Sequence, residues 1–108
     1  MSAILTWARR VFAGWILAVS AVAAWHFAGL PVSHGAPGWL MFSIAAVEAI
    51  AAAGFFWRPA ALAMAGLLAS FAAAAVIHIQ LGQQPVMLLV YALVTVLLYL
   101  AAQRQQQR

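Results

Sequence analysis

The sequence has no cysteine and very little charge. Without cysteine the chain can form no disulfide bond, no thiolate metal site and no thiol nucleophile. Charged residues make up 6% of the 108 residues, and only one of them is acidic, against five arginines. A glycine-rich phosphate loop, a Ser-His-Asp set and the usual spacings of metal ligands are also missing. These absences exclude a hydrolase or kinase of the soluble type, and we expect no metal site.

Apolar residues dominate what remains. They account for 69% of the chain, and the mean hydropathy is +1.05, which is typical of an integral membrane protein. A net charge of +4 can indicate nucleic-acid binding, but the arginines flank apolar runs and form no patch among stacking aromatic side chains. We therefore interpret the arginines as topology signals, and we expect a lipid bilayer around the chain and no nucleic-acid partner.

Four apolar runs are separated by short breaks rich in proline, glycine and polar residues. About 20 residues at 1.5 Å each cross a hydrocarbon core of about 30 Å. The runs predict an all-α fold, an antiparallel four-helix bundle that forms a single membrane domain. The predicted spans cover residues 11–30, 38–57, 59–81 and 86–102.

The first run has a second interpretation. Its basic start, its apolar centre and the small residues Ala21, Val22 and Ala23 also resemble a signal peptide with a cleavage site. We favour a retained span, because the run is long enough to cross the membrane.

The arginines predict the orientation of the chain. With four spans, the N-terminus, the second connection and the C-terminus lie on one side, and these segments contain Arg9, Arg10, Arg58, Arg104 and Arg108. The other two connections contain no lysine or arginine. The positive-inside rule therefore predicts a multi-pass protein of the bacterial cytoplasmic (inner) membrane with both termini in the cytoplasm.

The only acidic residue, Glu48, lies in the middle of the second run, whose ends carry Trp39 and Trp57. Tryptophans at such positions are typical of the two membrane interfaces, which places Glu48 near the middle of the bilayer. An ionised carboxylate at that depth costs roughly 2.5 kcal/mol or more. We expect the Glu48 carboxyl group to be protonated, hydrogen-bonded inside a helix bundle, or both.

Histidines lie closer to the predicted outer surface. His26 and His78 fall roughly 5 to 6 Å inside the outer boundary and Glu48 roughly 13 to 15 Å inside it, so direct pairing requires helix tilt or sliding. One interpretation is an outward-facing quinone pocket with Glu48 at its floor as proton acceptor, lined by His26, His78, Gln80 and His34. In the alternative, each imidazole reaches toward lipid headgroups or bonds a neighbouring helix.

A haem held between His26 and His78 is a third interpretation, because the two residues are matched in depth on parallel helices. Any two histidines near the same ends of two spans give this pattern, and no attachment motif accompanies it. If the chain binds a cofactor, we therefore expect a quinone and not a haem.

Two stripes of residues recur at helical spacing. Small residues in the third run suggest close helix packing inside the bundle, although alanine is also common in proteins of GC-rich genomes; these are Ala61, Ala65, Ala69 and Ala73, beside Gly66 and Ser70. In the fourth run, Tyr91, Thr95 and Tyr99 share one face. We interpret this face as helix-contact or interface surface, with a ligand-facing role as the alternative.

Several segments carry a family resemblance. An arginine precedes the first run, a glutamate is followed by small residues in VEAIAAAGFFW, and RPAALAMAGLLA and IHIQLGQQPVMLLVYAL follow. From Arg9 to Tyr99 the chain resembles the DoxX-like family of small four-span bacterial membrane proteins. Because that family is named for a subunit associated with thiosulfate:quinone oxidoreduction, the resemblance implies a role beside quinone-linked redox chemistry. Related sequences often carry a lysine after a glycine where this chain reads AAWHFAGLP, with His26 in that neighbourhood.

Two functions follow from these patterns. The first is a quinone-linked redox subunit that uses Glu48, His26 and His78 and passes electrons to a partner. The second is a non-catalytic accessory or assembly subunit of a larger membrane complex, in contact with a partner membrane protein or with further copies of itself. Whether the chain is an enzyme stays open between them. A channel or transporter is less favoured, because no broken helix or inverted repeat is evident.

Overall fold

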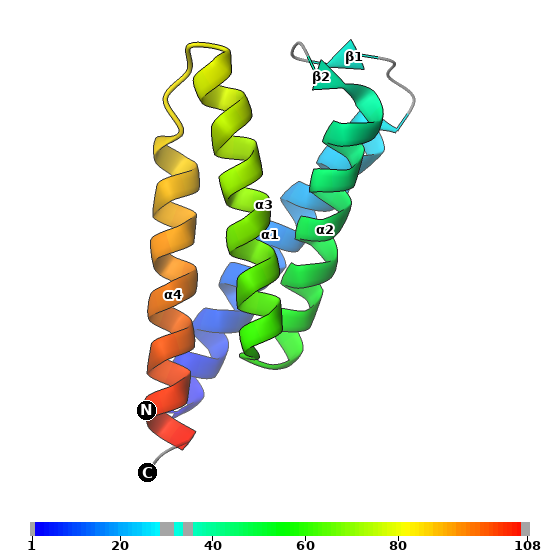
Figure 1. Cartoon of the computed structure of the whole chain (residues 1–108). Coiled ribbons are helices and arrows are strands. Elements are labelled where there is room, and N and C mark those ends of the chain that lie inside the picture. The colour runs from blue at the N-terminus through cyan, green and yellow to red at the C-terminus, as the bar shows by residue number, and fades with distance from the viewer. Residues whose placement is uncertain (1, 29–31, 34–35, 107–108) are drawn as a thin grey trace.

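A computed structural model describes residues 2–28, 32–33 and 36–106 of the chain. Over these residues the chain forms four helices and one short hairpin (Figure 1). The helices are α1 (Ser2–Phe27), α2 (Gly38–Trp57), α3 (Ala61–Gln80) and α4 (Val86–Gln106). Each is long and apolar enough to cross a membrane. The prediction of an all-α fold with four potential spans is confirmed.

A small β-hairpin joins α1 to α2, and the sequence pattern did not predict it. Strands β1 (Val32–Ser33) and β2 (Ala36–Pro37) pair antiparallel, with Val32 opposite Pro37 and Ser33 opposite Ala36. His34, which was predicted to join the quinone pocket, lies outside the described residues.

Helix α1 begins at Ser2, well before the predicted span, so Arg9 and Arg10 lie inside the helix. The residues before the apolar run include Ala3, Leu5 and Ala8, which favour helix, so the helix extends beyond the run. At the C-terminal end of α2 the last carbonyl groups have no partner within their own helix. The Arg9 guanidinium group donates to the carbonyl oxygens of Phe56 (3.1 Å) and Trp57 (3.5 Å). Arg9 is 8% exposed, and Arg10 stacks over the Phe56 ring at 5.6 Å. These contacts fasten the start of α1 to the end of α2.

Short connections make the consecutive helices antiparallel neighbours. Pro59 follows Arg58 in the link between α2 and α3, and α3 begins two residues later. After α3 the chain turns at Gly82, whose φ of 77° lies in the left-handed region that glycine adopts without a steric penalty. The Gln83 amide then donates to the His78 carbonyl oxygen over 2.8 Å.

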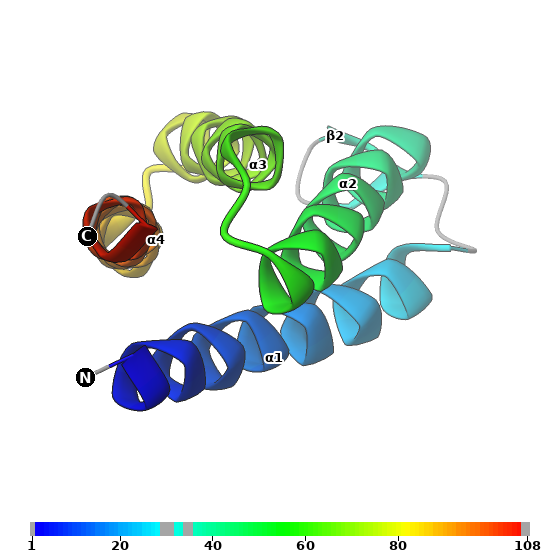
Figure 2. The same ribbon diagram turned by 90° about the horizontal axis from the view of Figure 1, so that it is seen from below.

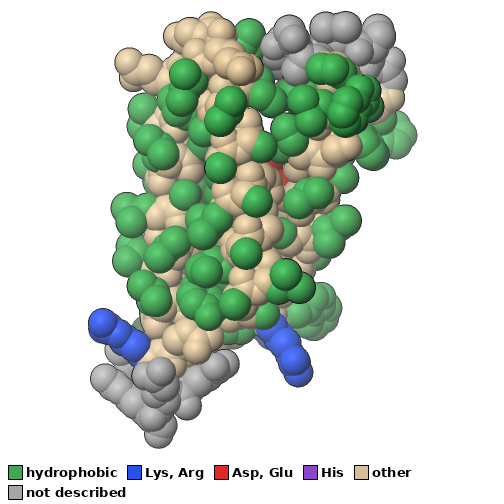
Figure 3. All heavy atoms as spheres, viewed as in Figure 1, with side chains coloured by type: hydrophobic (Ala, Val, Ile, Leu, Met, Phe, Trp, Pro, Cys, Tyr) green, Lys and Arg blue, Asp and Glu red, His purple; other side chains and the backbone are tan. Residues whose placement is uncertain are grey.

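The helices form two pairs that separate toward one end. Figure 2 shows α2 between α1 and α3, with α4 on the far side of α3. In Figure 1, α2 leans away from α3 toward the end that carries the hairpin. The opposite end carries the described arginines, and those on the visible face lie at the lower end of Figure 3.

Buried apolar side chains from α1, α2 and α3 form the core, which consists of Ala13, Ile16, Ala51, Ala52, Phe55, Leu67 and Phe71. Gly66 brings α3 close to α2, because a Cβ atom at Gly66 would lie 2.9 Å from the Cβ atom of Ala51. The buried hydroxyl groups beside this core each donate to the carbonyl oxygen four residues earlier: Ser20 to Ile16, Ser70 to Gly66, and Thr95 to Tyr91. Such bonds satisfy polar groups without a second helix.

Only part of the small-residue packing predicted for α3 is found within the chain. Gly66 lies close to Ala51 and Ser70 is buried, as predicted, whereas Ala61, Ala65 and Ala69 are exposed and Ala73 is half-buried. The inward face of α3 is instead set by Leu67 and Phe71, with Ser70 between them. Larger side chains bury more apolar area than alanine and therefore determine which face turns inward.

The stripe on α4 does face inward, as the helix-contact interpretation predicts. Thr95 is fully buried, and Tyr91 and Tyr99 pack against the core. Tyr91 meets the Phe12 ring edge to face at 6.1 Å and accepts a hydrogen bond from the Trp15 indole over 3.1 Å. This face connects α4 to α1.

The close approach at Gly66 gives a testable prediction for stability. In Gly66→Ala the added methyl group meets Ala51 at 2.9 Å, so we expect a loss of about 1–3 kcal/mol relative to Gly54→Ala. The Gly54 variant is the matched control, because its Cβ atom would meet Ala63 at an ordinary 3.5 Å and gains the same helix propensity. Unfolding in detergent measures the difference. Equal stability of the two variants would contradict a tight contact at Gly66.

Candidate functional site

A cavity of about 190 Å³ lies between α1, α2 and α3, in the half of the molecule that carries the hairpin. Its lining is mostly apolar and includes the polar side chains of Glu48, His78 and Gln83. In Figure 3 the acidic colour appears in the hollow between α2 and α3, and Glu48 is the only acidic residue of the chain. The cavity therefore contains the one acidic side chain and one of the three histidines.

Helical periodicity brings Glu48 and His78 to the cavity. On α2 the lining residues are Met41, Ile44, Ala45 and Glu48, and on α3 and its end they are Ala74, Ile77, His78 and Leu81. Both sets follow the spacing i, i+3, i+4 and i+7, which places side chains on one face of a helix. Helix α1 contributes Ala23 and Phe27. The lean of α2 away from α3 leaves these two faces apart.

The cavity also extends over the difference in depth that the sequence predicts between Glu48 and His78. Glu48 lies about 15 Å along α2 from its start at Gly38, whereas His78 lies about 3 Å from the end of α3 at Gln80. The stripe from Met41 to Glu48 covers two helical turns of the wall. The hollow thus reaches from the helix ends near Gln83 inward to the carboxyl group.

Glu48 is half-buried and lies beside the hydroxyl group of Ser20 on α1. The Ser20 hydroxyl donates its proton to the Ile16 carbonyl oxygen over 2.6 Å, which leaves lone pairs that can accept. In its protonated form the Glu48 carboxyl group has one proton, which it can donate either to Ser20 or to a ligand in the cavity. The expectation of a neutral, hydrogen-bonded acid stays a prediction.

His78 is held in one tautomer. Its Nδ1 atom lies 2.8 Å from the carbonyl oxygen of Ala74, and a carbonyl oxygen can only accept, so Nδ1 carries the proton. In the neutral imidazole the Nε2 atom is then an acceptor. His78 can therefore accept a hydrogen bond from a hydroxyl group, while Glu48 can donate one. A ligand with two oxygen atoms fits this pair chemically.

The other sequence-predicted residues do not line the cavity. His26 is exposed and packs edge to face against Phe27 at 5.3 Å, and Gln80 is also exposed. The sequence pattern missed Ser20 and Gln83. Ser20 is the only hydroxyl residue between positions 11 and 25, which is a usable signal. Gln83 reaches the cavity through the turn at Gly82, and no periodicity predicts that position.

The size of the cavity limits what it can hold. Pockets that bury a drug-sized ligand measure about 300–1,000 Å³, so 190 Å³ suits a single ring or a few water molecules. Within the described ranges, no three His, Cys, Asp or Glu residues lie together where they could ligate a metal ion. The polar groups of the cavity are arranged for hydrogen bonding and proton exchange.

Comparisons of the chain with protein-family models, with curated proteins and with solved structures give no match. The resemblance to DoxX-like proteins stays a prediction. The chemistry of the cavity is the firmer basis for assigning a function.

Because Glu48 is the only acidic residue, its protonation can be measured directly. We expect the infrared carbonyl stretch of a protonated carboxylic acid at neutral pH. This band can be assigned to Glu48, since an α-carboxyl group is ionised at that pH. Glu48→Gln removes the band, and Ser20→Ala shifts it because the hydrogen bond is lost. Ser70→Ala is the matched control, since Ser70 makes the same local bond to Gly66 outside the cavity. No such band in the native chain would contradict the donor role of Glu48.

Proposed function

We propose that the chain is a multi-pass membrane protein whose arginine-bearing end faces the cytoplasm of a bacterial cell. Four apolar helices support this placement, as does the position of Arg9, Arg10, Arg58 and Arg104 at one end of the molecule. Trp39 and Trp57, at the two ends of α2, are 70% and 73% exposed, as residues at the two interfaces are. Large aliphatic side chains are exposed along all four helices, where a bilayer would cover them.

Within that membrane, we propose that the Glu48 and His78 cavity binds the ring of a quinol and that the chain acts in quinone-linked redox chemistry. The observation that carries this proposal is that Glu48 and His78 line the same apolar cavity, where Nε2 of neutral His78 can accept a hydrogen bond and a protonated Glu48 can donate one. One ring hydroxyl group donates to Nε2 of His78, and the other ring oxygen takes the place of Ser20 as the acceptor of the single proton on the Glu48 carboxyl group. The lipophilic tail lies outside, because the cavity is too small for it.

Proton transfer follows from the same geometry. Oxidation of a quinol releases two protons and two electrons. Nε2 of His78 accepts the first proton, and Glu48 accepts the second only after its own proton has left toward solvent. The electrons pass to a partner redox protein. In this proposal Glu48 acts as the proton acceptor in one part of the cycle, in line with the expectation from the sequence, and as a hydrogen-bond donor in the resting state.

The function is tested by measuring the quinone bound to protein purified gently from membranes. We expect about one quinone per chain, and a loss of at least about fivefold in His78→Leu and in Glu48→Leu, since a buried hydrogen-bonding group left unpaired costs about 1–3 kcal/mol. Glu48→Gln keeps a donor and therefore retains binding, but it cannot take up a proton. His26→Leu is the control, because His26 lies outside the cavity. Native protein without quinone, or uniform binding in all variants, would reject the redox function.

An accessory or assembly role is the second proposal, and the outer face of α4 favours it. Exposed residues on this helix alternate at spacings of four and three, namely Val86, Val90, Leu93, Leu97 and Leu100. This spacing is typical of a seam that packs against another helix. The face of α4 that carries Tyr91 packs against other helices of the same chain. The seam is therefore the surface of α4 that is free to contact a partner. The exposed alanines of α3 remain open to a partner.

The native chain has no cysteine, so single substitutions can test the seam. If copies of the chain pair through α4, we expect Leu93→Cys and Leu97→Cys to form disulfide-linked dimers under mild oxidation in membranes. Met87→Cys is the control, because Met87 is 59% exposed but lies about 100° around the helix from Val86 and so off the seam. Equal cross-linking at all three positions would indicate random collision and would contradict a seam between copies.

A further inference from the structure

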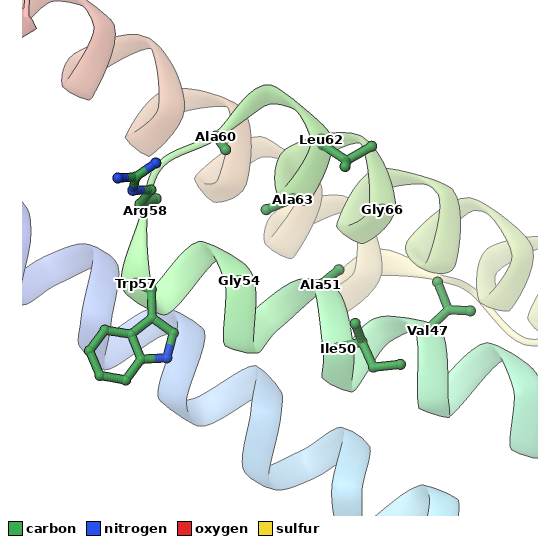
Figure 4. A pocket seen from close by; sticks show the side chains of 10 residues that line it. All are labelled: Val47, Ile50, Ala51, Gly54, Trp57, Arg58, Ala60, Leu62, Ala63 and Gly66. Carbon is green, nitrogen blue, oxygen red and sulfur yellow. The ribbon is translucent and has the colours of Figure 1, made fainter.

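A second hollow lies between α2 and α3, away from the cavity that holds Glu48. It is a groove of about 580 Å³, shown in Figure 4, and it ends where the two helices join. Its floor consists of the small residues Ala51, Gly54, Ala63 and Gly66, at the point where Gly66 brings the helices close together. Exposed aliphatic side chains of Ile50 and Leu62 form its rims. Neither proposed function uses this groove.

The length of the groove matches one leaflet of a bilayer. From Val47 to Arg58 it follows α2 for about 16 Å, which is roughly half of a hydrocarbon core of about 30 Å. Trp57 lies at its closed end and is 73% exposed, as an interfacial tryptophan is. The groove therefore runs from an interface toward the middle of the membrane.

A polar hollow continues the groove at this end. It measures about 390 Å³, is lined by Arg58, Pro59, Ala60 and Gln103, and shares Arg58 and Ala60 with the groove. Arg58 is exposed, and the chain offers no acidic side chain to pair with it, because the only one, Glu48, lines the other cavity. The apolar groove, which suits an acyl chain, thus adjoins a cationic hollow, which suits a lipid headgroup.

We propose that the groove and the hollow together bind one anionic phospholipid, with an acyl chain along Gly54 and Gly66 and the phosphate at Arg58. Arginine binds phosphate through paired N–H donors. A second copy of this chain brings no acidic side chain other than Glu48 and cannot neutralise Arg58, whereas an anionic headgroup does. The proposal rests on membrane insertion and is independent of quinone binding.

Native mass spectrometry of the full chain, released from bilayers of phosphatidylglycerol and phosphatidylcholine with identical acyl chains, tests this site. We expect one retained lipid per chain and about a fivefold preference for phosphatidylglycerol, the factor that corresponds to about 1 kcal/mol for one arginine near an anionic surface. Arg58→Gln removes the preference but keeps a retained lipid. Arg104→Gln is the matched control, since it removes the same charge at an exposed site outside the hollow.

A second pair of variants tests the groove itself. Gly54→Leu fills the groove and should abolish retention of both lipids, whereas Ala72→Leu adds the same bulk on an exposed face of α3 and should not. Equal effects of Arg58→Gln and Arg104→Gln would overturn the headgroup site, and lipid retained by Gly54→Leu would overturn the groove. A change from dimer to monomer in Gly54→Leu with unchanged lipid would assign the groove to contact between copies. Glu48→Leu should leave the lipid bound, which separates this test from that of the quinone site.

Discussion

Polar groups inside apolar helices must find their hydrogen-bonding partners within the protein, and the structure depends on how this chain meets that requirement. Ser20, Ser70, Thr95 and His78 each bond to the carbonyl oxygen one turn earlier in their own helix. Such local bonds need no partner helix, so they leave the packing of the helices to apolar side chains. Glu48 forms no such local bond, and it lies beside the Ser20 hydroxyl group of α1 and the cavity between α1, α2 and α3.

The two ends of the molecule differ in consequence. At the arginine-bearing end, Phe55 and Phe71 fill the core, and Arg9 closes the end of α2. Toward the hairpin, α2 leans away from α3 (Figure 1). Glu48 and His78 line the cavity between these helices and α1. A well-packed end thus holds the helices in register, and a looser end provides room for a ligand. Ligand binding requires such room. The room is obtained by losing packing contacts between α2 and α3, which the arginine-bearing end retains.

Much of the fold was predictable because hydropathy and proline positions limit where apolar helices can begin and end. Helix α2 coincides with its predicted span, and α3 and α4 differ only at their ends. The start of α1 lies outside the apolar run, so hydropathy did not predict it. The alanines of the α3 stripe were predicted wrongly to pack inside the bundle, although Gly66 and Ser70 do so, because alanine spacing identifies a stripe without saying which neighbour it meets. Of the candidate site, Glu48 and His78 could be named from the sequence, but their shared cavity follows from helix lean, which no local pattern encodes.

The bond between Arg9 and the end of α2 also bears on how the protein is made. Every group in that contact belongs to the first 58 residues, as do the Ser20 and Glu48 pair and the Ile16 and Phe55 core contacts. The first helical hairpin can therefore close during translation, before α3 has left the ribosome. The second hairpin then packs against a preformed surface. Synthesis in this order places Glu48 beside α1 before α3 completes the wall of its cavity.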